Sequence, residues 1–69
     1  MPELQTLTLR TDELEALRLC DLEGFDQAEA GERMGVSRGT VQRLVKAGRE
    51  TVIRTLVEGR ALIIGEPKV

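Results

Sequence analysis

The sequence predicts a mainly α-helical domain, with three helices and a short β-strand near each end of the chain. Three observations support this fold class. Apolar residues recur at helical spacing, a capping residue precedes each such stretch, and a glycine follows it. At 69 residues the chain has room for one domain, which we place over residues 1–69.

The two strands are predicted from short segments near the ends. Residues 5–10 alternate polar and apolar side chains, which is typical of a strand. Residues 60–65 are strongly apolar and are followed by a terminating Pro67. We expect the two strands to pair antiparallel, either within one chain or between two chains.

The first helix is predicted over about residues 12–22. Thr11 or Asp12 can cap its start, and Asp12 and Glu15 have the spacing of a capping box. Gly24 is well placed as the cap at the other end. The lone Cys20 falls within the apolar pattern, so we interpret it as a small buried hydrophobic residue and not as a reactive thiol.

The second and third helices are predicted over about residues 27–34 and 38–58. Asp26 and Ser37 precede them as caps, and Gly35 and Gly59 end them. The sequence leaves open a bend of the third helix at its central glycine. The apolar stripe of that helix comprises Val41, Leu44, Val45, Gly48, Val52 and Leu56.

These two helices have the spacing of a helix-turn-helix. That motif needs a small residue where its helices cross, a glycine in the turn and an aliphatic plug in the second helix. Gly31, Gly35 and Val41 occupy those three places. The stretch resembles the helix-turn-helix of bacterial transcription regulators, with one departure. Gly31 stands where alanine is more usual, at a cost of about 0.5–1 kcal/mol in helix stability.

The charge of the chain is divided unevenly between its two halves. Residues 1–32 contain two basic and nine acidic side chains, a net charge of −7, whereas residues 33–69 contain eight basic and three acidic ones, a net charge of +5. The total of −2 hides this division. A basic half favours nucleic-acid contact, although the two halves could also simply pair with each other.

A polar stripe on the third helix is the predicted DNA-binding surface. At about 100° per residue, Arg38, Gln42, Lys46 and Arg49 fall within an arc of about 80°. Arg38 and Gln42 are the candidates for base contacts, because arginine recognises guanine and glutamine recognises adenine. Lys46 and Arg49 are candidates for phosphate contacts.

Four more residues complete the predicted DNA site. The hydroxyls of Ser37 and Thr40 lie near the helix start and suit phosphate, although Ser37 is first a cap. Gly39 would let the backbone approach a duplex. Arg43 lies farther round the helix and, like Arg54, could instead pair with acidic residues of the first half.

Several separated blocks between Leu9 and Ile63 carry a further resemblance. They are residues 12–19, 21–24, 27, 29–30, 32–38 and 56–62, and they include Asp12-Glu13-Leu14-Glu15-Ala16-Leu17-Arg18-Leu19 and Glu32-Arg33-Met34-Gly35-Val36-Ser37-Arg38. These blocks resemble a small prokaryotic family of predicted DNA-binding proteins, domain of unknown function family 134. It implies a DNA-binding helix-turn-helix similar to that of sigma factors. Family members typically carry a cysteine-rich segment ahead of this block, which the printed sequence lacks. We therefore expect no metal- or redox-sensing role to carry over.

We expect the protein to form a homodimer. Ile53 and Val57 lie off the main apolar stripe of the third helix, and Leu62-Ile63-Ile64 would be an exposed edge in a monomer. The late third helix and the terminal strands are therefore the predicted interface. The alternative is that the tail folds over the chain's own core.

Other function classes have weaker support in the sequence. The chain has no histidine and one cysteine, so we expect no metal site, no cofactor and no catalytic activity. No apolar run is long enough to span a membrane and no signal peptide opens the sequence, so we expect a cytoplasmic protein. The main alternative to DNA binding is an adaptor that docks to another protein, such as the transcription machinery.

Overall fold

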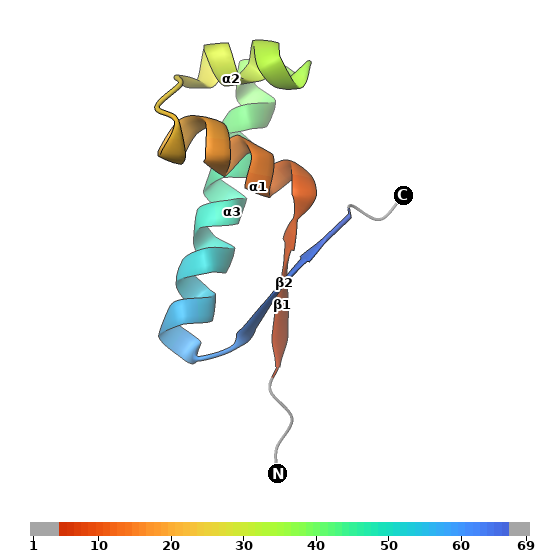
Figure 1. Cartoon of the computed structure of the whole chain (residues 1–69), viewed down its shortest axis with the longest axis vertical. Coiled ribbons are helices and arrows are strands. Elements are labelled where there is room, and N and C mark those ends of the chain that lie inside the picture. The colour runs from red at the N-terminus through yellow and green to blue at the C-terminus, as the bar shows by residue number, and fades with distance from the viewer. Residues whose placement is uncertain (1–4, 67–69) are drawn as a thin grey trace.

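The structure, a computed structural model, describes residues 5–66. Along the chain it contains β1 (Thr6–Arg10), α1 (Thr11–Leu17), η1 (Arg18–Leu22), α2 (Gln27–Met34), α3 (Arg38–Glu58) and β2 (Ala61–Gly65), as Figure 1 shows. The predicted fold class is confirmed: three helical regions lie between two short terminal strands. The predicted strand terminator Pro67 lies outside the described residues.

The first helical region begins differently from the prediction. β1 runs directly into α1, so Arg10 takes the cap position and neither Thr11 nor Asp12 does. The Arg10 backbone N–H donates to Glu13 Oε1 at 3.0 Å, which satisfies one donor at the helix start and gives the buried Glu13 carboxylate a partner. The first helical region ends in η1, a π-helical segment that continues from α1 without a break.

The caps predicted for the other two helices are confirmed. Asp26 accepts a hydrogen bond from the Glu29 backbone N–H at 2.8 Å, and the Glu29 carboxylate accepts one from Asp26 N–H. Ser37 Oγ accepts from the Thr40 backbone N–H at 3.1 Å. α3 is one uninterrupted helix, and its central Gly48 serves packing, because a Cβ there would lie 2.9 Å from Leu17 Cδ1.

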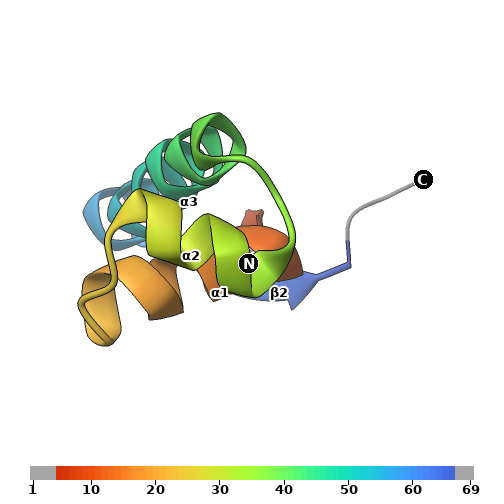
Figure 2. The same ribbon diagram turned by 90° about the horizontal axis from the view of Figure 1, so that it is seen from above.

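The core lies where α1, η1, α2 and α3 meet. Figure 2, which looks down from above, shows these helices gathered together, with the strands leading away beneath them. Half-buried apolar side chains, including Phe25 and Met34, pack around the centre of this core. The central residues, all between 0% and 4% exposed, are Ala16, Leu19, Ala30, Val41 and Val45.

The two strands pair parallel within one chain, so the antiparallel prediction was wrong. Thr6 pairs with Ala61 and Arg10 with Gly65, with the intervening residues in register. The reason is the path of the chain in Figure 1. α3 runs back along the whole helical region to the level where β1 starts, and β2 then runs in the same direction as β1.

Apolar residues near this sheet remain largely exposed. Leu9 of β1 is buried, but Leu56 of α3 is 73% exposed, so its assignment to the buried stripe was wrong. The stripe ends earlier, because α1 and η1 contact only the upstream part of α3, and Thr55 is its last buried position. Ile53 and Val57 are also exposed, as the sequence predicted.

Candidate nucleic-acid interface

The turn between α2 and α3 brings the two helices into close approach. Gly31 is buried, and a Cβ there would lie only 2.7 Å from the Val36 carbonyl oxygen. Gly35 follows α2 with φ +72°, a left-handed conformation that favours glycine. Val41 is fully buried and anchors α3 in the core. The three positions predicted from helix-turn-helix spacing therefore have the packing roles expected of them.

The polar stripe predicted on α3 lies on its outward face. Val41, Val45 and Gly48 are buried on one side of the helix, so residues about half a turn away face solvent. Arg38, Gln42 and Lys46 are all exposed. Among residues 5–66, neither Arg38 nor Lys46 takes part in an ion pair. Two cations and an amide are thus available to a partner along about two turns of α3.

The hydroxyls at the start of α3 form a local network. Ser37 Oγ donates to Thr40 Oγ1 at 3.0 Å, and Arg43 Nη2 donates to the same oxygen at 3.1 Å. Gly39 lies next to this network. A Cβ at Gly39 would lie 3.7 Å from Arg43 Nη1, an ordinary van der Waals contact. The alternative left open by the sequence, an ion pair of Arg43 with an acidic residue, is not seen among the described residues. Instead, Arg43 is held close to the α3 N-terminus.

Arg49 is the predicted site residue whose surroundings differ most from the expectation. Its Nε and Nη2 donate to the two carboxylate oxygens of Asp21, at 3.0 and 2.6 Å. This bidentate hydrogen bonding lowers the pKa of Asp21 and raises that of Arg49. Arg49 therefore joins α3 to η1, and its charge is already partly compensated before any partner binds.

Asp21 is a residue that the sequence analysis missed. It lies 28 positions before Arg49, so no local spacing relates the two residues. It stands in the π-helical segment η1, whose wider turn changes where side chains point relative to a regular α-helix. The one available signal was the excess of acidic residues in the first half of the chain.

A groove borders the polar stripe between η1, the start of α2 and α3. It is lined by residues that include Arg38, Arg49, Asp21, Asp26 and Cys20. Burial, with a contribution from Asp21, raises the pKa of the Cys20 thiol. The thiol is therefore protonated at neutral pH. Cys20 packs against the core, but it is half-buried and not buried as the sequence predicted.

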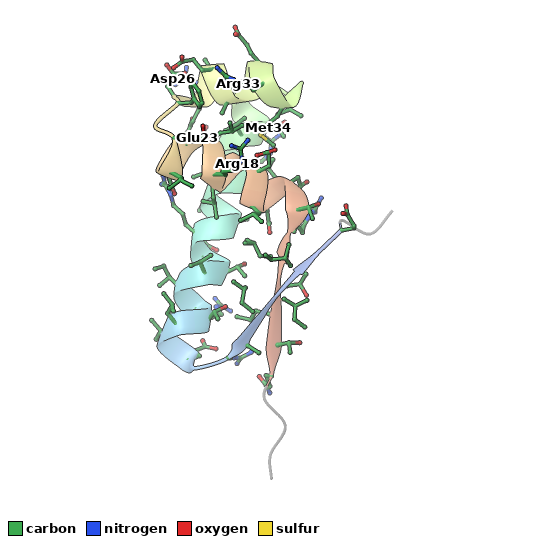
Figure 3. The ribbon with its side chains drawn as sticks, in the orientation of Figure 1. Arg18, Glu23, Asp26, Arg33 and Met34 are labelled. Atoms are coloured by element: carbon green, nitrogen blue, oxygen red, sulfur yellow. The ribbon has the colours of Figure 1, made fainter. Side chains whose placement is uncertain are left out.

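A second depression lies where α1 meets α2, shown with its side chains in Figure 3. Arg18 pairs there with Glu15 at 2.6 Å and also with Glu23, and the first of these contacts is the main reason that its pKa is raised. The Arg33 guanidinium lies 4.1 Å from the centre of the Phe25 ring. Phe25 thus packs between the core and a cation, so its predicted role as a core anchor is confirmed.

The outward face of α3 changes character along its length. Ile53, Leu56 and Val57 continue the face that carries Arg38, Gln42 and Lys46, because all six fall within an arc of about 100°. They are 57%, 73% and 78% exposed, respectively. The face is therefore polar and cationic in its first half and apolar in its second half.

Residues 5–66 contain neither a cluster of metal-ligating side chains nor a helix suited to cross a membrane. Within this range, no group of three or more histidine, cysteine, aspartate or glutamate side chains is placed to hold a metal ion. No helix of the same range combines the length and the apolar character needed to cross a membrane.

Comparison with known proteins identifies the family. The family described as "Protein of unknown function DUF134" matches residues 1–68. A UPF0251 protein of Pyrococcus furiosus is 52% identical over 63 residues, which cover 91% of this chain and 58% of that protein. A UPF0251 protein of Thermococcus kodakarensis is 62% identical over 53 residues, covering 77% of this chain and 47% of that protein.

A third relative gives a similar match. A UPF0251 protein of Syntrophobacter fumaroxidans is 55% identical over 64 residues, covering 93% of this chain and 41% of that protein. This chain spans about half the length of the curated relatives it matches. No solved structure matches it. On the family match and these identities, the chain belongs to the DUF134 family of proteins of unknown function.

Proposed function

We propose that this chain binds double-stranded DNA sequence-specifically through the first half of α3, and that it regulates transcription in the cytoplasm without catalysing a reaction. The observation that carries the proposal is the exposed polar stripe of Arg38, Gln42 and Lys46 on the second helix of a helix-turn-helix. In such motifs the N-terminal part of the second helix enters the major groove.

The residues of the stripe have different proposed roles. Arg38 and Gln42 contact bases, because their side chains carry the donors and acceptors that distinguish guanine and adenine. Lys46 contacts phosphate as a point charge. The start of α3 approaches the DNA backbone through four residues, Ser37, Gly39, Thr40 and Arg43. The Arg43 guanidinium gives one N–H donor to Thr40 and keeps its other donors for a phosphate.

Arg49 has a smaller proposed role than its position in the stripe alone would give it. Its bidentate contact with Asp21 uses two of its five N–H donors, which leaves three for a phosphate. The carboxylate also offsets its charge, so Arg49 contributes less than Lys46 to the release of counterions from DNA.

A binding assay with random duplex DNA across a salt series tests the proposal. Affinity should fall steeply as salt rises, and Lys46→Ala should reduce the slope of log K against log salt by about 1. Arg54→Ala is the matched control, because it removes a cation from the same helix at a position outside the stripe. Equal effects of both substitutions would contradict the proposed contact of Lys46 with phosphate.

A protein-binding adaptor is the second candidate function. The observation that favours it is the exposed apolar second half of the same α3 face, formed by Ile53, Leu56 and Val57. Binding to duplex DNA that does not depend on salt, or no binding at all, would favour the adaptor.

A further inference from the structure

We propose that the free edge of β2 pairs with β2 of a second copy of this chain, antiparallel and in a register centred on Ile63. The strand carries no charged residue and no proline between Ala61 and Gly65. Leu62, Ile63 and Ile64 are 40%, 47% and 54% exposed. Natural edge strands are usually protected by such charges or prolines, so an apolar edge without them marks a pairing surface.

The backbone of β2 has its unpaired groups at the required positions. The Ala61 N–H donates to the Gln5 carbonyl oxygen at 3.2 Å, so Ala61 faces β1. Alternation along a strand then turns the N–H and C=O groups of Leu62 and Ile64 to the opposite, free edge. In an antiparallel pair centred on Ile63, Leu62 of each copy lies opposite Ile64 of the other, so both residues face a partner that can exchange hydrogen bonds.

The charges at the two ends of the strand select this register. Centring on Ile63 brings Arg60 of each copy opposite Glu66 of the other, which creates two pairs of opposite charge. In the monomer, Arg60 Nε contacts Glu58 at 2.6 Å and Glu66 Oε2 accepts a hydrogen bond from Thr11 Oγ1 at 3.1 Å. Among the described residues, no other contact takes up the remaining guanidinium donors of Arg60 or the second carboxylate oxygen of Glu66, so both can form the cross-copy pair.

A second copy also meets a need of the sheet itself. Two parallel strands alone are marginal, and parallel sheets are normally covered on both faces. Leu7 and Leu9 share one sheet face with Leu62 and Ile64, because the register pairs Leu7 with Leu62 and Leu9 with Ile64. Pairing of two β2 strands would join two such faces into one apolar layer of four strands.

The apolar half of α3 is a less suitable dimer surface, a point that rests on the proposed DNA binding. Ile53 and Val57 share their face with Arg38 and Lys46. If two copies packed through that face, the polar stripes of their α3 helices would point in opposite directions. One straight duplex could not contact both stripes. Pairing through the β2 edge uses none of the residues of the polar stripe of α3.

The first test measures the mass of the 69-residue chain in solution, without DNA, by light scattering at micromolar concentration. We expect twice the chain mass of 7.6 kDa. Ile64→Pro removes a backbone donor on the free edge and should raise the dimer dissociation constant by about tenfold or more. Ile64→Ala is the matched control, because it shortens the same side chain but keeps the donor and should remain more dimeric.

A second variant covers the case in which Ile64→Pro fails to fold, as judged by circular dichroism. Ile63→Lys places two like charges opposite each other at the centre of the proposed register and should also give monomers. A wild-type monomer at every concentration would overturn the proposal. A dimer that survives both Ile64→Pro and Ile63→Lys but is lost with Ile53→Lys would overturn it too, in favour of α3.

The register is tested by exchanging charges between copies. Arg60→Glu alone and Glu66→Arg alone each place like charges opposite each other in a homodimer, so each should dimerise more weakly than wild type. Mixing the two variants restores both opposite-charge pairs, and a heterodimer should form in preference to either homodimer. No preference on mixing would contradict the register centred on Ile63.

These outcomes are separate from those of the DNA proposal. A monomer that binds duplex DNA in a salt-dependent way would contradict the β2 pairing and leave the DNA proposal standing. A dimer of the predicted register that binds no duplex would contradict the DNA proposal and leave the β2 pairing standing.

Discussion

The two ends of the molecule differ in how completely they bury their apolar residues. The helical end comprises α1, η1, α2 and the first half of α3, and its central residues are at most 4% exposed. The strand end comprises β1, β2 and the second half of α3. There Leu9 is buried, but Ile53, Leu56 and Val57 are more than half exposed.

This difference indicates that the two ends have different tasks. At the helical end α1, η1, α2 and the first half of α3 meet and close a core, which fixes the start of α3 and the direction of its polar stripe. At the strand end one long helix and two strands leave apolar surface uncovered. Exposed apolar surface of this kind is typical of an interaction site.

The largest difference in stability should appear when a valine is replaced by alanine at each end of the molecule. Val41→Ala leaves a cavity in the core and should lower the free energy of unfolding by about 2–3 kcal/mol. Val57→Ala, at a position 78% exposed, should change it by less than about 0.5 kcal/mol. Urea denaturation of dilute protein measures both, and similar losses would contradict the division between the two ends.

A smaller effect should follow from removing the cap of α3. Ser37→Ala removes the acceptor of the Thr40 backbone N–H and should cost about 1 kcal/mol of stability. Ser37→Asn keeps an oxygen acceptor and should restore most of that loss. If Ser37→Asn is as destabilised as Ser37→Ala in the same urea experiment, the hydroxyl serves another purpose.

The smallest expected effect concerns the contact that joins η1 to the middle of α3. The pKa of Asp21 is lowered by Arg49 in the folded protein, so the pair stabilises the fold above the unfolded-state pKa of about 4. This contribution is lost as pH falls through the lowered pKa. Asp21→Asn should therefore be slightly less stable than wild type at pH 7, and the difference should shrink in strong acid.

Arg49→Gln provides the control for this pH dependence. It removes the other partner of the same contact, so it should lose stability at pH 7 to a similar extent and with the same dependence on acid. Thermal melting curves of the three proteins at neutral and acidic pH make the comparison. A stability difference that is equal at both pH values would show that the Asp21 carboxylate acts through something other than this ion pair.

The sequence allowed the local features to be predicted and not the long-range ones. Asp26, Ser37, Gly31 and Gly35 act within a few residues of their positions, so spacing alone was enough to assign them. The direction of β2 depends on where α3 ends relative to β1. No local sequence pattern contains that information. The helix cap at Arg10 was missed for a related reason, since β1 continues directly into α1.

The candidate site shows the same limit. Helical spacing correctly placed Arg38, Gln42 and Lys46 on the exposed face of α3. It could not show that Arg49 would meet Asp21, because that contact depends on how η1 packs beside α3. Leu56 was assigned to the core by periodicity alone, although the elements that would cover it do not extend that far.

The most direct test of DNA reading by α3 is an NMR titration of the isotope-labelled chain with a duplex selected from a random pool. We expect selection to enrich a defined sequence, and the largest shift changes to fall on the backbone amides of residues 37–46. Residues 53–58, on the apolar half of the same helix, should change little. No enriched sequence, or changes confined to residues 53–65, would contradict the account.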